Sequence, residues 1–331
     1  MNSDLPKVLH PLAGAPLLVH AMRSGAAVKP ARTVVVTGYG GKDVAAAAHD
    51  HDPEALIAVQ QKAMGTGHAA LQARAALSDF EGDAVVLFGD TPFVRPQTIA
   101  AMLAARRKHA IVVLGFEAAD PKRYGRLVMR DETLERIVEH KDATPEDLSI
   151  TICNGGVIAA DSGMLFDLLS QVTNANANGE FYLTDIVALA RARGLSAGVV
   201  VCDEAETQGI NTRVDLAEAE ATLQSAMRRQ ALENGVTLVA PETVFFCHDT
   251  VIGRDALIEA NVVFGPGVTI ESGALIRAFS HLEGCHVARD AIVGPYARLR
   301  PGAELSEGAR VGNFVEVKNA TLAEGVKVNH L

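Results

Sequence analysis

A six-residue repeat fills the last quarter of this 331-residue sequence and strongly limits what it can fold into. From residue 251 onward, a large apolar residue recurs at every sixth position with one shorter step, and mostly small residues follow four positions later. Neither the helical period of 3.6 nor the strand period of 2 produces this pattern. A six-residue period is typical of a parallel β-helix, in which each hexapeptide forms one face of a coil and its large residue points inward. The inward series comprises Ile252, Ile258, Phe264, Ile270, Ile276, Leu282, Val287, Val293, Leu299, Leu305, Val311 and Val317.

The part before residue 236 follows a different rule, because short β-branched runs alternate with Ala/Leu-rich stretches. This alternation predicts parallel βαβ units covered by helices on both faces, a doubly wound α/β domain. Ligands of such sheets bind at the carboxyl ends of the strands, and Asp90 lies at one of these ends. We expect strands over 33–38, 56–59, 84–90 and 111–114, and helices over 67–77 and 96–109.

These patterns predict three parts of the chain. Residues 1–212 form the α/β domain, the Ala/Glu/Gln-rich segment 213–235 forms a linking helix, and residues 236–331 form the β-helix.

The charge balance narrows the partners of the chain. With 30 Lys and Arg against 40 Asp and Glu, the formal net charge is −10, which argues against nucleic acid or an anionic membrane as the main partner. The sequence contains no apolar run of membrane-spanning length and no visible signal peptide, so we expect no membrane span and a cytoplasmic location. The four cysteines are widely spaced, which favours free thiols in a reducing compartment over a disulfide pair.

Motifs in both halves together resemble one family, the bacterial enzymes that combine N-acetylglucosamine-1-phosphate uridylyltransferase with glucosamine-1-phosphate N-acetyltransferase. The resemblance covers essentially the whole chain and implies a nucleotidyltransferase domain followed by a left-handed β-helix. The first half carries SDLPKVL at 3–9, GTGHA at 65–69, FGD at 88–90, YGR at 124–126, IVEHKDA at 137–143, NGG at 154–156, YLTD at 182–185 and GIN at 209–211. The second half carries ARLRPG at 297–302 and VGNFVEVK at 311–318.

The sequence departs from the family pattern at both ends. The family opens with a strand and a Gly-rich loop ending in Thr-Arg-Met, and Met1 stands where that last Met would be. The β-helix stops in mid-coil at Leu331, before most residues that bind the acetyl donor in the family. We therefore expect a piece of a longer enzyme that lacks its first strand, with both activities impaired.

The resemblance implies uridylyl transfer from UTP to N-acetylglucosamine 1-phosphate, with Mg²⁺ as cofactor. Asp90 and Asn211 would be the Mg²⁺ ligands, and the ammonium of Lys7 would contact the phosphates. Such transfer asks the protein chiefly to position two anions and to neutralise charge. The alternatives are helix caps for Asp90 and Asn211, and an exposed helix-start lysine for Lys7.

Further residues of this site are implied by the same resemblance. The amide of Gln60 would read the uracil base, together with the Gly65-Thr66-Gly67 loop, whose backbone N–H groups are predicted to be available to a ligand. The non-functional alternatives are a surface position for Gln60 and an ordinary turn at 65–67. For Glu139, which the resemblance places in the sugar pocket, the alternative is a solvated salt bridge. The other implied substrate-binding residues are Phe88 and Gly89, beside the metal ligand, and Gly125, Glu139 and Asn154 in the sugar pocket.

For the second reaction, the resemblance implies acetyl transfer from acetyl-CoA to glucosamine 1-phosphate. His330 would be the general base, a role that suits an imidazole. Arg300 and Lys318 would bind the sugar phosphate, and both lie outside the inward series, so they should point outward. Their alternative is simple solvation. The family's sites lie between neighbouring β-helices, which implies a homotrimer.

Two other functions stay open from the sequence. Beside the function that the resemblance implies, the alternatives are a nucleotidyltransferase for another sugar, such as glucose 1-phosphate, and a non-catalytic trimeric fragment. The motifs around Glu139 and Asn154 favour the N-acetyl sugar.

Overall fold

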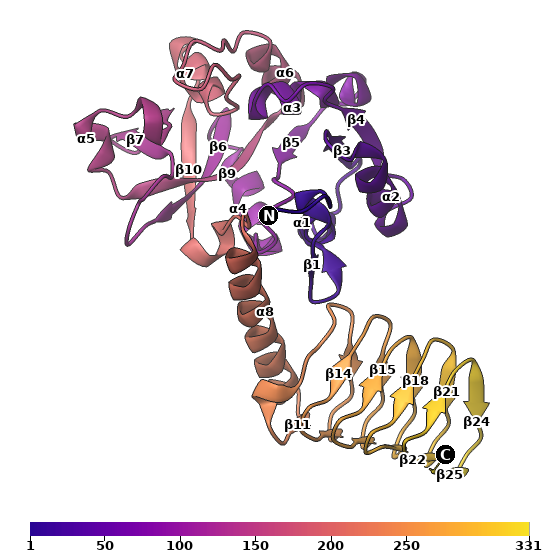
Figure 1. Cartoon of the computed structure of the whole chain (residues 1–331). Helices are drawn as coiled ribbons and strands as arrows, with labels where there is room; N and C mark the ends of the chain where they lie inside the picture. The colour runs from indigo at the N-terminus through magenta and orange to yellow at the C-terminus, as the bar shows by residue number, and fades with distance from the viewer. Residues whose placement is uncertain (331) are drawn as a thin grey trace. The chain divides into compact units, whose positions relative to one another are not determined.

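The computed structural model describes residues 1–330 and divides the chain into two compact units (Figure 1). The first unit comprises Met1–His10 and Pro16–Asn211. The second comprises Pro11–Ala15 and the chain from Thr212 onward, so that the 213–235 helix belongs to the β-helix unit rather than standing alone. The sequence pattern gave no sign that the short segment at 11–15 groups with the second unit.

The first unit alternates strands and helices as the sequence predicts. Its strands are β3 (Val34–Thr37), β4 (Leu56–Val59), β5 (Asp83–Val86), β6 (Ile111–Glu117), β7 (Arg126–Arg130), β8 (Thr133–Val138), β9 (Ile152–Asp161) and β10 (Ala197–Cys202). Its α-helices are α1 (Leu17–Ala26), α2 (Gly41–His51), α3 (Thr66–Leu71), α4 (Pro96–Ala105), α5 (Pro145–Leu148), α6 (Ser162–Leu169) and α7 (Asp185–Ala192).

The expectation of parallel βαβ units holds for only part of the sheet. β7 runs antiparallel to β8, and β9 runs antiparallel to β5, β6 and β7. β10 pairs with β6 in parallel. β3 and β4 form a parallel pair of their own, and among the described strands β5 pairs only with β9. Antiparallel strands need no crossover helix, which is why helix–strand alternation alone did not reveal β9.

A buried aliphatic core holds this sheet together. All of Ile111, Val112, Val113 and Leu114 in β6 are inaccessible to solvent, as expected for a strand covered on both faces. The loop after β5 carries residues 87–90 away from this rigid centre, and the site described below is built around it.

The second unit begins with α8 (Arg213–Glu233), which starts in a capping box. The Thr212 side chain accepts from the backbone N–H of Asp215, and the Asp215 carboxylate accepts from the backbone N–H of Thr212. Further along the helix, the buried Gln224 amide bonds both the N–H and the C=O of Phe246. These bonds fix the helix to the first turn of the β-helix.

The β-helix itself consists of short parallel strands in three sheets, which are seen as successive arrows in Figure 1. The first sheet contains β11 (Thr237–Leu238), β13 (Leu257–Ile258), β16 (Leu275–Ile276), β19 (Ile292–Val293), β22 (Arg310–Asn313) and β25 (Lys327–His330). The second contains β12 (Val251–Ile252), β15 (Thr269–Ile270), β18 (Cys285–Val287), β21 (Ala303–Leu305) and β24 (Ala320–Leu322). The third contains β14 (Val263–Phe264), β17 (His281–Leu282), β20 (Arg298–Leu299) and β23 (Glu316–Val317).

The six-residue prediction is confirmed residue by residue. Every member of the inward series packs in one apolar cluster, and all but Ile252 are buried there. The small residues four positions later, such as Ala274 and Ala309, are buried as well. The shorter step falls at a corner beside Gly284, so the strands on either side keep their register.

Three aromatic rings stack along one corner of this β-helix, and we call them the aromatic ladder: Phe279, Tyr296 and Phe314. Their centroids are 4.9 Å and 5.3 Å apart, at interplanar angles of 4° and 24°. Their exposed fractions are 51%, 49% and 62%, and all three residues have left-handed backbone conformations. Bulky residues adopt this conformation only at a cost in free energy, so the corner presents these rings to solvent against the local preference of the backbone.

Two further features bear on the class of protein. The four cysteines are free thiols. Within residues 1–330, no helix combines the length and the apolar character that crossing a bilayer requires.

Candidate active sites

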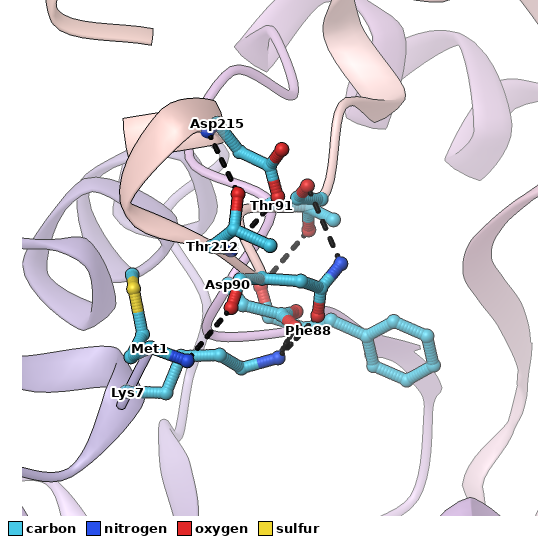
Figure 2. Close-up of polar contacts among 9 residues, drawn as sticks. Met1, Lys7, Phe88, Asp90, Thr91, Thr212 and Asp215 are labelled. Carbon is cyan, nitrogen blue, oxygen red and sulfur yellow. Dashed lines mark hydrogen bonds and ion pairs between the residues drawn. The ribbon is translucent and has the colours of Figure 1, made fainter. Parts of the chain in front are cut away.

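Three polar side chains from distant parts of the sequence meet beyond the end of β5. The strand expected over 84–90 ends at Val86, so Asp90 lies in the following turn rather than at the strand end. The ammonium of Lys7 forms an ion pair with the Asp90 carboxylate and donates to the Asn211 side-chain oxygen over 2.9 Å. Figure 2 shows the Lys7 side chain reaching Asp90. The backbone also ties the segments together, since the Ile210 N–H donates to the Asp90 carbonyl over 3.0 Å.

The helix-cap alternatives for Asp90 and Asn211 do not hold. Helix α4 begins at Pro96 and its N-cap is Arg95, so Asp90 does not cap it. The N-cap of α8 is Thr212, not Asn211. Lys7 does begin a short 3₁₀ helix and its side chain is 37% exposed, but its ammonium is also bonded to Asp90 and Asn211.

The arrangement of these groups fits a divalent cation. A carboxylate oxygen of Asp90 and the amide oxygen of Asn211 both bond to the same cation, the Lys7 ammonium. Oxygen donors of this kind are the ligands that Mg²⁺ prefers, and one or two protein ligands leave room for phosphate oxygens. The donor set around Asp90 is therefore chemically suited to hold Mg²⁺.

The Gln60 side chain is fixed against the glycine-containing loop rather than lying free on the surface. Its amide nitrogen donates to the Gly65 carbonyl over 3.1 Å and lies 2.9 Å from Nδ1 of His68. This leaves its side-chain oxygen as the group that can accept from a ligand.

The expectation that this loop offers its N–H groups is partly wrong. The Gly67 N–H donates to the Phe181 carbonyl over 2.8 Å, and the Thr66 hydroxyl accepts from the Leu183 N–H. A Cβ at Gly65 would lie 2.5 Å from the Phe181 oxygen, and its φ is +105°. The glycine is needed because the backbone of the 181–183 segment packs directly against the loop.

Three predicted sugar-pocket residues do come together. The Asn154 N–H donates to the Gly125 carbonyl over 2.8 Å, and a Cβ at Gly125 would lie 3.4 Å from a Glu139 carboxylate oxygen. Burial raises the pKa of Glu139, the nearby Asp185 and Asp142 carboxylates raise it further, and a hydrogen bond from the Thr184 hydroxyl opposes the shift. Burial makes the charged form of this carboxylate unfavourable, and hydrogen bonds donated by sugar hydroxyls would stabilise that form.

The two predicted residues before Asp90 have packing roles that also shape this region. A Cβ at Gly156 would lie 2.8 Å from the Phe88 ring, so this ring fits only against a glycine. A Cβ at Gly89 would lie 3.2 Å from Val8, which brings the 88–90 loop close to the segment that carries Lys7.

The sequence reasoning missed several residues around Glu139. A hollow of about 440 Å³ is lined by Glu139 and by Arg123, His140, Lys141 and Asn178. The Lys141 ammonium donates to Asn178, whose amide donates to the Tyr182 hydroxyl. The motifs at 137–143 and 182–185 contained several of these residues, but nothing in their spacing showed that they face one hollow.

In the second unit, Arg300 and Lys318 lie side by side on successive coils and point outward, as predicted. The Arg300 N–H donates to the Val317 carbonyl, and its guanidinium donates to Glu316 over 2.9 Å. This contact lowers the pKa of Glu316. The exposed His330 lies on another sheet, at the end of β25 and paired in register with Asn313. One copy of the chain therefore does not bring His330 onto the sheet that carries Arg300.

Comparison with known proteins supports a nucleotidyltransferase first half and a hexapeptide-repeat second half. Residues 1–159 match the MobA-like NTP transferase domain, and residues 249–284 match six bacterial transferase hexapeptide repeats. The fold of the first part is similar to the crystal structure of UDP-glucose pyrophosphorylase complexed with UDP-glucose, with a TM-score of 0.51 at 18% identity over 67% of this chain and 91% of that one.

Similarity to curated proteins extends over the whole chain. It is 66% identical over 331 residues to the bifunctional protein GlmU of Roseobacter denitrificans and 60% identical to that of Jannaschia sp.. All of this chain is aligned in both cases, against 74% and 73% of those proteins. Identity at this level over such a length establishes the relationship: the chain belongs to the family of bifunctional GlmU proteins.

Proposed function

We propose that this chain carries the machinery for Mg²⁺-dependent uridylyl transfer from UTP to N-acetylglucosamine 1-phosphate, and for acetyl transfer from acetyl-CoA to glucosamine 1-phosphate. The first reaction is assigned to residues 1–212 and the second to residues 236–331. The proposal rests chiefly on one observation: the Lys7 ammonium contacts both the Asp90 carboxylate and the Asn211 side-chain oxygen.

In the first reaction, the chain's own residues position two anions. Asp90 and Asn211 would hold Mg²⁺, which when bound neutralises phosphate charge. Lys7 turns its ammonium from these oxygens to the phosphates of UTP. With its nitrogen fixed by Gly65, the Gln60 amide presents its oxygen to the N–H of the uracil edge.

The sugar 1-phosphate occupies the region of Gly125, Glu139 and Asn154. The Glu139 carboxylate accepts from sugar hydroxyls, and the absence of a side chain at Gly125 allows close approach of the ring. Phe88 and Gly89 shape the wall between the sugar and Asp90.

The acetyltransferase site requires more than one copy of the chain. Arg300 and Lys318 hold the sugar phosphate, and His330 removes a proton from the amine, yet these groups lie on different sheets of the β-helix. We propose a homotrimer in which neighbouring β-helices complete each site, and a cytoplasmic location. The exposed aromatic ladder supports association through the β-helix, because contiguous exposed apolar groups mark interaction sites and aromatic residues are enriched at interfaces.

The first reaction is tested by pyrophosphate release from UTP and Mg²⁺ with a panel of sugar 1-phosphates. We expect N-acetylglucosamine 1-phosphate to be preferred over glucose 1-phosphate, and Asp90→Asn to abolish the release. Asp83→Asn, at the start of β5, is the control. A preference for glucose 1-phosphate would contradict N-acetylglucosamine 1-phosphate as the substrate. The absence of both turnover and MgUTP binding would refute the uridylyltransferase assignment.

The trimer is tested by light scattering with size-exclusion chromatography on the full chain. We expect three copies for the wild type and a shift to monomer when Phe279, Tyr296 and Phe314 are all replaced by Ser. A monomeric wild type would contradict the proposal.

A further inference from the structure

A cluster of metal-binding side chains lies in the second unit, far along the chain from the residues assigned above. Cys247, His248 and Asp249 are consecutive, and their Sγ, Nδ1 and carboxylate oxygen atoms all lie within 4.8 Å of one another. Within residues 1–330, no other group of three Cys, His, Asp or Glu side chains meets this condition.

The backbone around the cluster is fixed by hydrogen bonds. The Cys247 N–H donates to the Thr250 hydroxyl over 3.0 Å, and the Thr250 N–H donates to the Cys247 carbonyl over 3.1 Å. The His248 N–H donates to the Ala13 carbonyl over 2.8 Å, which ties the turn to the 11–15 segment. These bonds fix the backbone of the turn, while the Cys247 thiol also contacts the Ala13 carbonyl and Nδ1 of His248.

One ligating atom has no hydrogen-bond partner. The Asp249 carboxylate accepts from the Gly267 N–H over 2.8 Å through Oδ2, whereas Oδ1 is buried and accepts no hydrogen bond from any described residue. A buried carboxylate oxygen without a partner is costly, and the cost disappears when a cation binds it. Oδ1 lies 3.9 Å from Nδ1 of His248, which lies 3.3 Å from Sγ of Cys247.

A catalytic Cys-His-Asp relay does not fit these distances. In such a relay the imidazole bonds the nucleophile with one nitrogen and the carboxylate with the other. Here both Sγ and Oδ1 approach the same nitrogen, and 3.9 Å is too long for a hydrogen bond.

We propose that Cys247, His248 and Asp249 form a binding site for a borderline-soft divalent cation such as Zn²⁺. Tetrahedral zinc places its sulfur, nitrogen and oxygen ligands about 3.3–3.6 Å apart. The Sγ–Nδ1 separation of 3.3 Å already matches, and Oδ1 would have to approach Nδ1 from its present 3.9 Å to complete the set. Cys247 is buried, while the side chains of His248 and Asp249 are 20% and 36% exposed, so an ion has access and a water molecule can fill the fourth position.

The site would join two parts of the second unit. The Cys247 thiol contacts the Ala13 carbonyl at 3.2 Å, and a Cβ at Gly14 would lie 2.5 Å from Sγ. A bound ion therefore stabilises the turn on which the 11–15 segment packs, which makes its role structural and independent of both proposed reactions.

The test is a Co²⁺ titration of the reduced full chain in chelator-free buffer. We expect one equivalent to give a thiolate-to-cobalt charge-transfer band and the visible bands of tetrahedral cobalt, and excess Zn²⁺ to remove both. Cys247→Ser should lose the charge-transfer band. Cys285→Ser, which replaces another buried thiol in the same unit, should retain it.

Two further variants decide the outcome if Cys247→Ser does not fold. Asp249→Asn and His248→Gln should each weaken Co²⁺ binding more than about tenfold, because even partners outside the coordination shell contribute that much. Zn²⁺ should raise the melting temperature of the wild type but not of Asp249→Asn. The proposal is overturned if the wild type shows no band at millimolar Co²⁺, or if the band survives unchanged in Cys247→Ser or in both other variants.

Discussion

The two units assemble their functional residues in opposite ways. In the first, Lys7 contacts Asp90 and Asn211, which are 83 and 204 residues away along the chain. In the second, Arg300 contacts Glu316 only 16 residues away, because each coil places its residues above those of the coil before. In the repeat, the place of a residue on the surface can therefore be read from its position in the sequence. In the α/β unit, it depends on the whole tertiary structure.

This difference also separates stability from function. In the β-helix, the inward residues determine stability and the outward ones are available for binding. In the α/β unit, the same residues contribute to both stability and function. Glu139 is half-buried, and the backbones of Gly125 and Asn154 are hydrogen-bonded to each other beside it. The predictions below test this contrast.

The largest effect is expected from the core of the β-helix. Leu299→Ala removes a fully buried inward side chain and should lower the free energy of unfolding of the second unit by about 2–5 kcal/mol. Urea unfolding followed by circular dichroism measures it. Arg310→Ala, an outward position on β22, should change the same quantity by less than about 0.5 kcal/mol. Equal losses in the two variants would contradict the division into inward and outward residues.

The next effect concerns Lys7, and it has opposite signs for metal and nucleotide. Lys7→Gln removes the cation that occupies the point between Asp90 and Asn211, so Mn²⁺ alone should bind more tightly. UTP should bind about 10–100-fold more weakly, because a hydrogen bond to a charged group is lost. Isothermal titration measures both, with the exposed Lys108→Gln as control. Weaker binding of both ligands would show that Lys7 only supports the fold.

A smaller effect is expected from the protonation of Glu139. Because burial raises its pKa in the folded state, the folded chain holds more protons than the unfolded one, and stability falls as pH rises from the ordinary carboxyl range through the raised value. Glu139→Gln should therefore be at least as stable as the wild type at pH 8, and the difference should vanish in acid. Thermal unfolding across pH measures this. A variant that is less stable at pH 8 would mean that the Thr184 hydrogen bond outweighs burial.

The smallest effect is expected at the outer face of the β-helix. Glu316→Gln removes the carboxylate that holds Arg300, yet the pair is exposed, so the urea midpoint should not change measurably. Binding of inorganic phosphate at Arg300 should strengthen, because the competing anion is gone. A clear drop in the midpoint would show that this ion pair stabilises the coil.

Most of the β-helix was predictable, because its period assigned residues such as Ile276 and Leu299 to the core without any tertiary information. The strand at 56–59 has the predicted ends, the strand at 111–114 extends to Glu117, and the helix at 96–109 ends at Ala105. The strand expected over 84–90 is shorter and ends at Val86. The direction of β9 was not predictable, since an apolar strand has the same composition in either direction.

The candidate site was predictable only where family motifs named its residues. The resemblance supplied Asp90 and Asn211, but no pattern indicated that Lys7 would bridge them or that the Gly67 N–H would be used by Phe181. Those contacts depend on how distant loops meet. Likewise, the cluster at 247–249 was invisible, because consecutive residues in a strand would point in opposite directions and only a turn brings them together.

The register of the β-helix has a consequence for how the chain reaches its native state. Leu257 pairs with Leu275 and His281 with Arg298, so each strand meets its partner after 18 or 17 residues. Each coil can therefore add to the one before it by closing a short loop, and folding can propagate in one dimension. The α/β unit must close loops of up to 204 residues before Lys7 and Asn211 meet. Because non-local contacts slow folding, we expect the β-helix to gain protection from hydrogen exchange first and the corner of the α/β unit that carries Lys7 last.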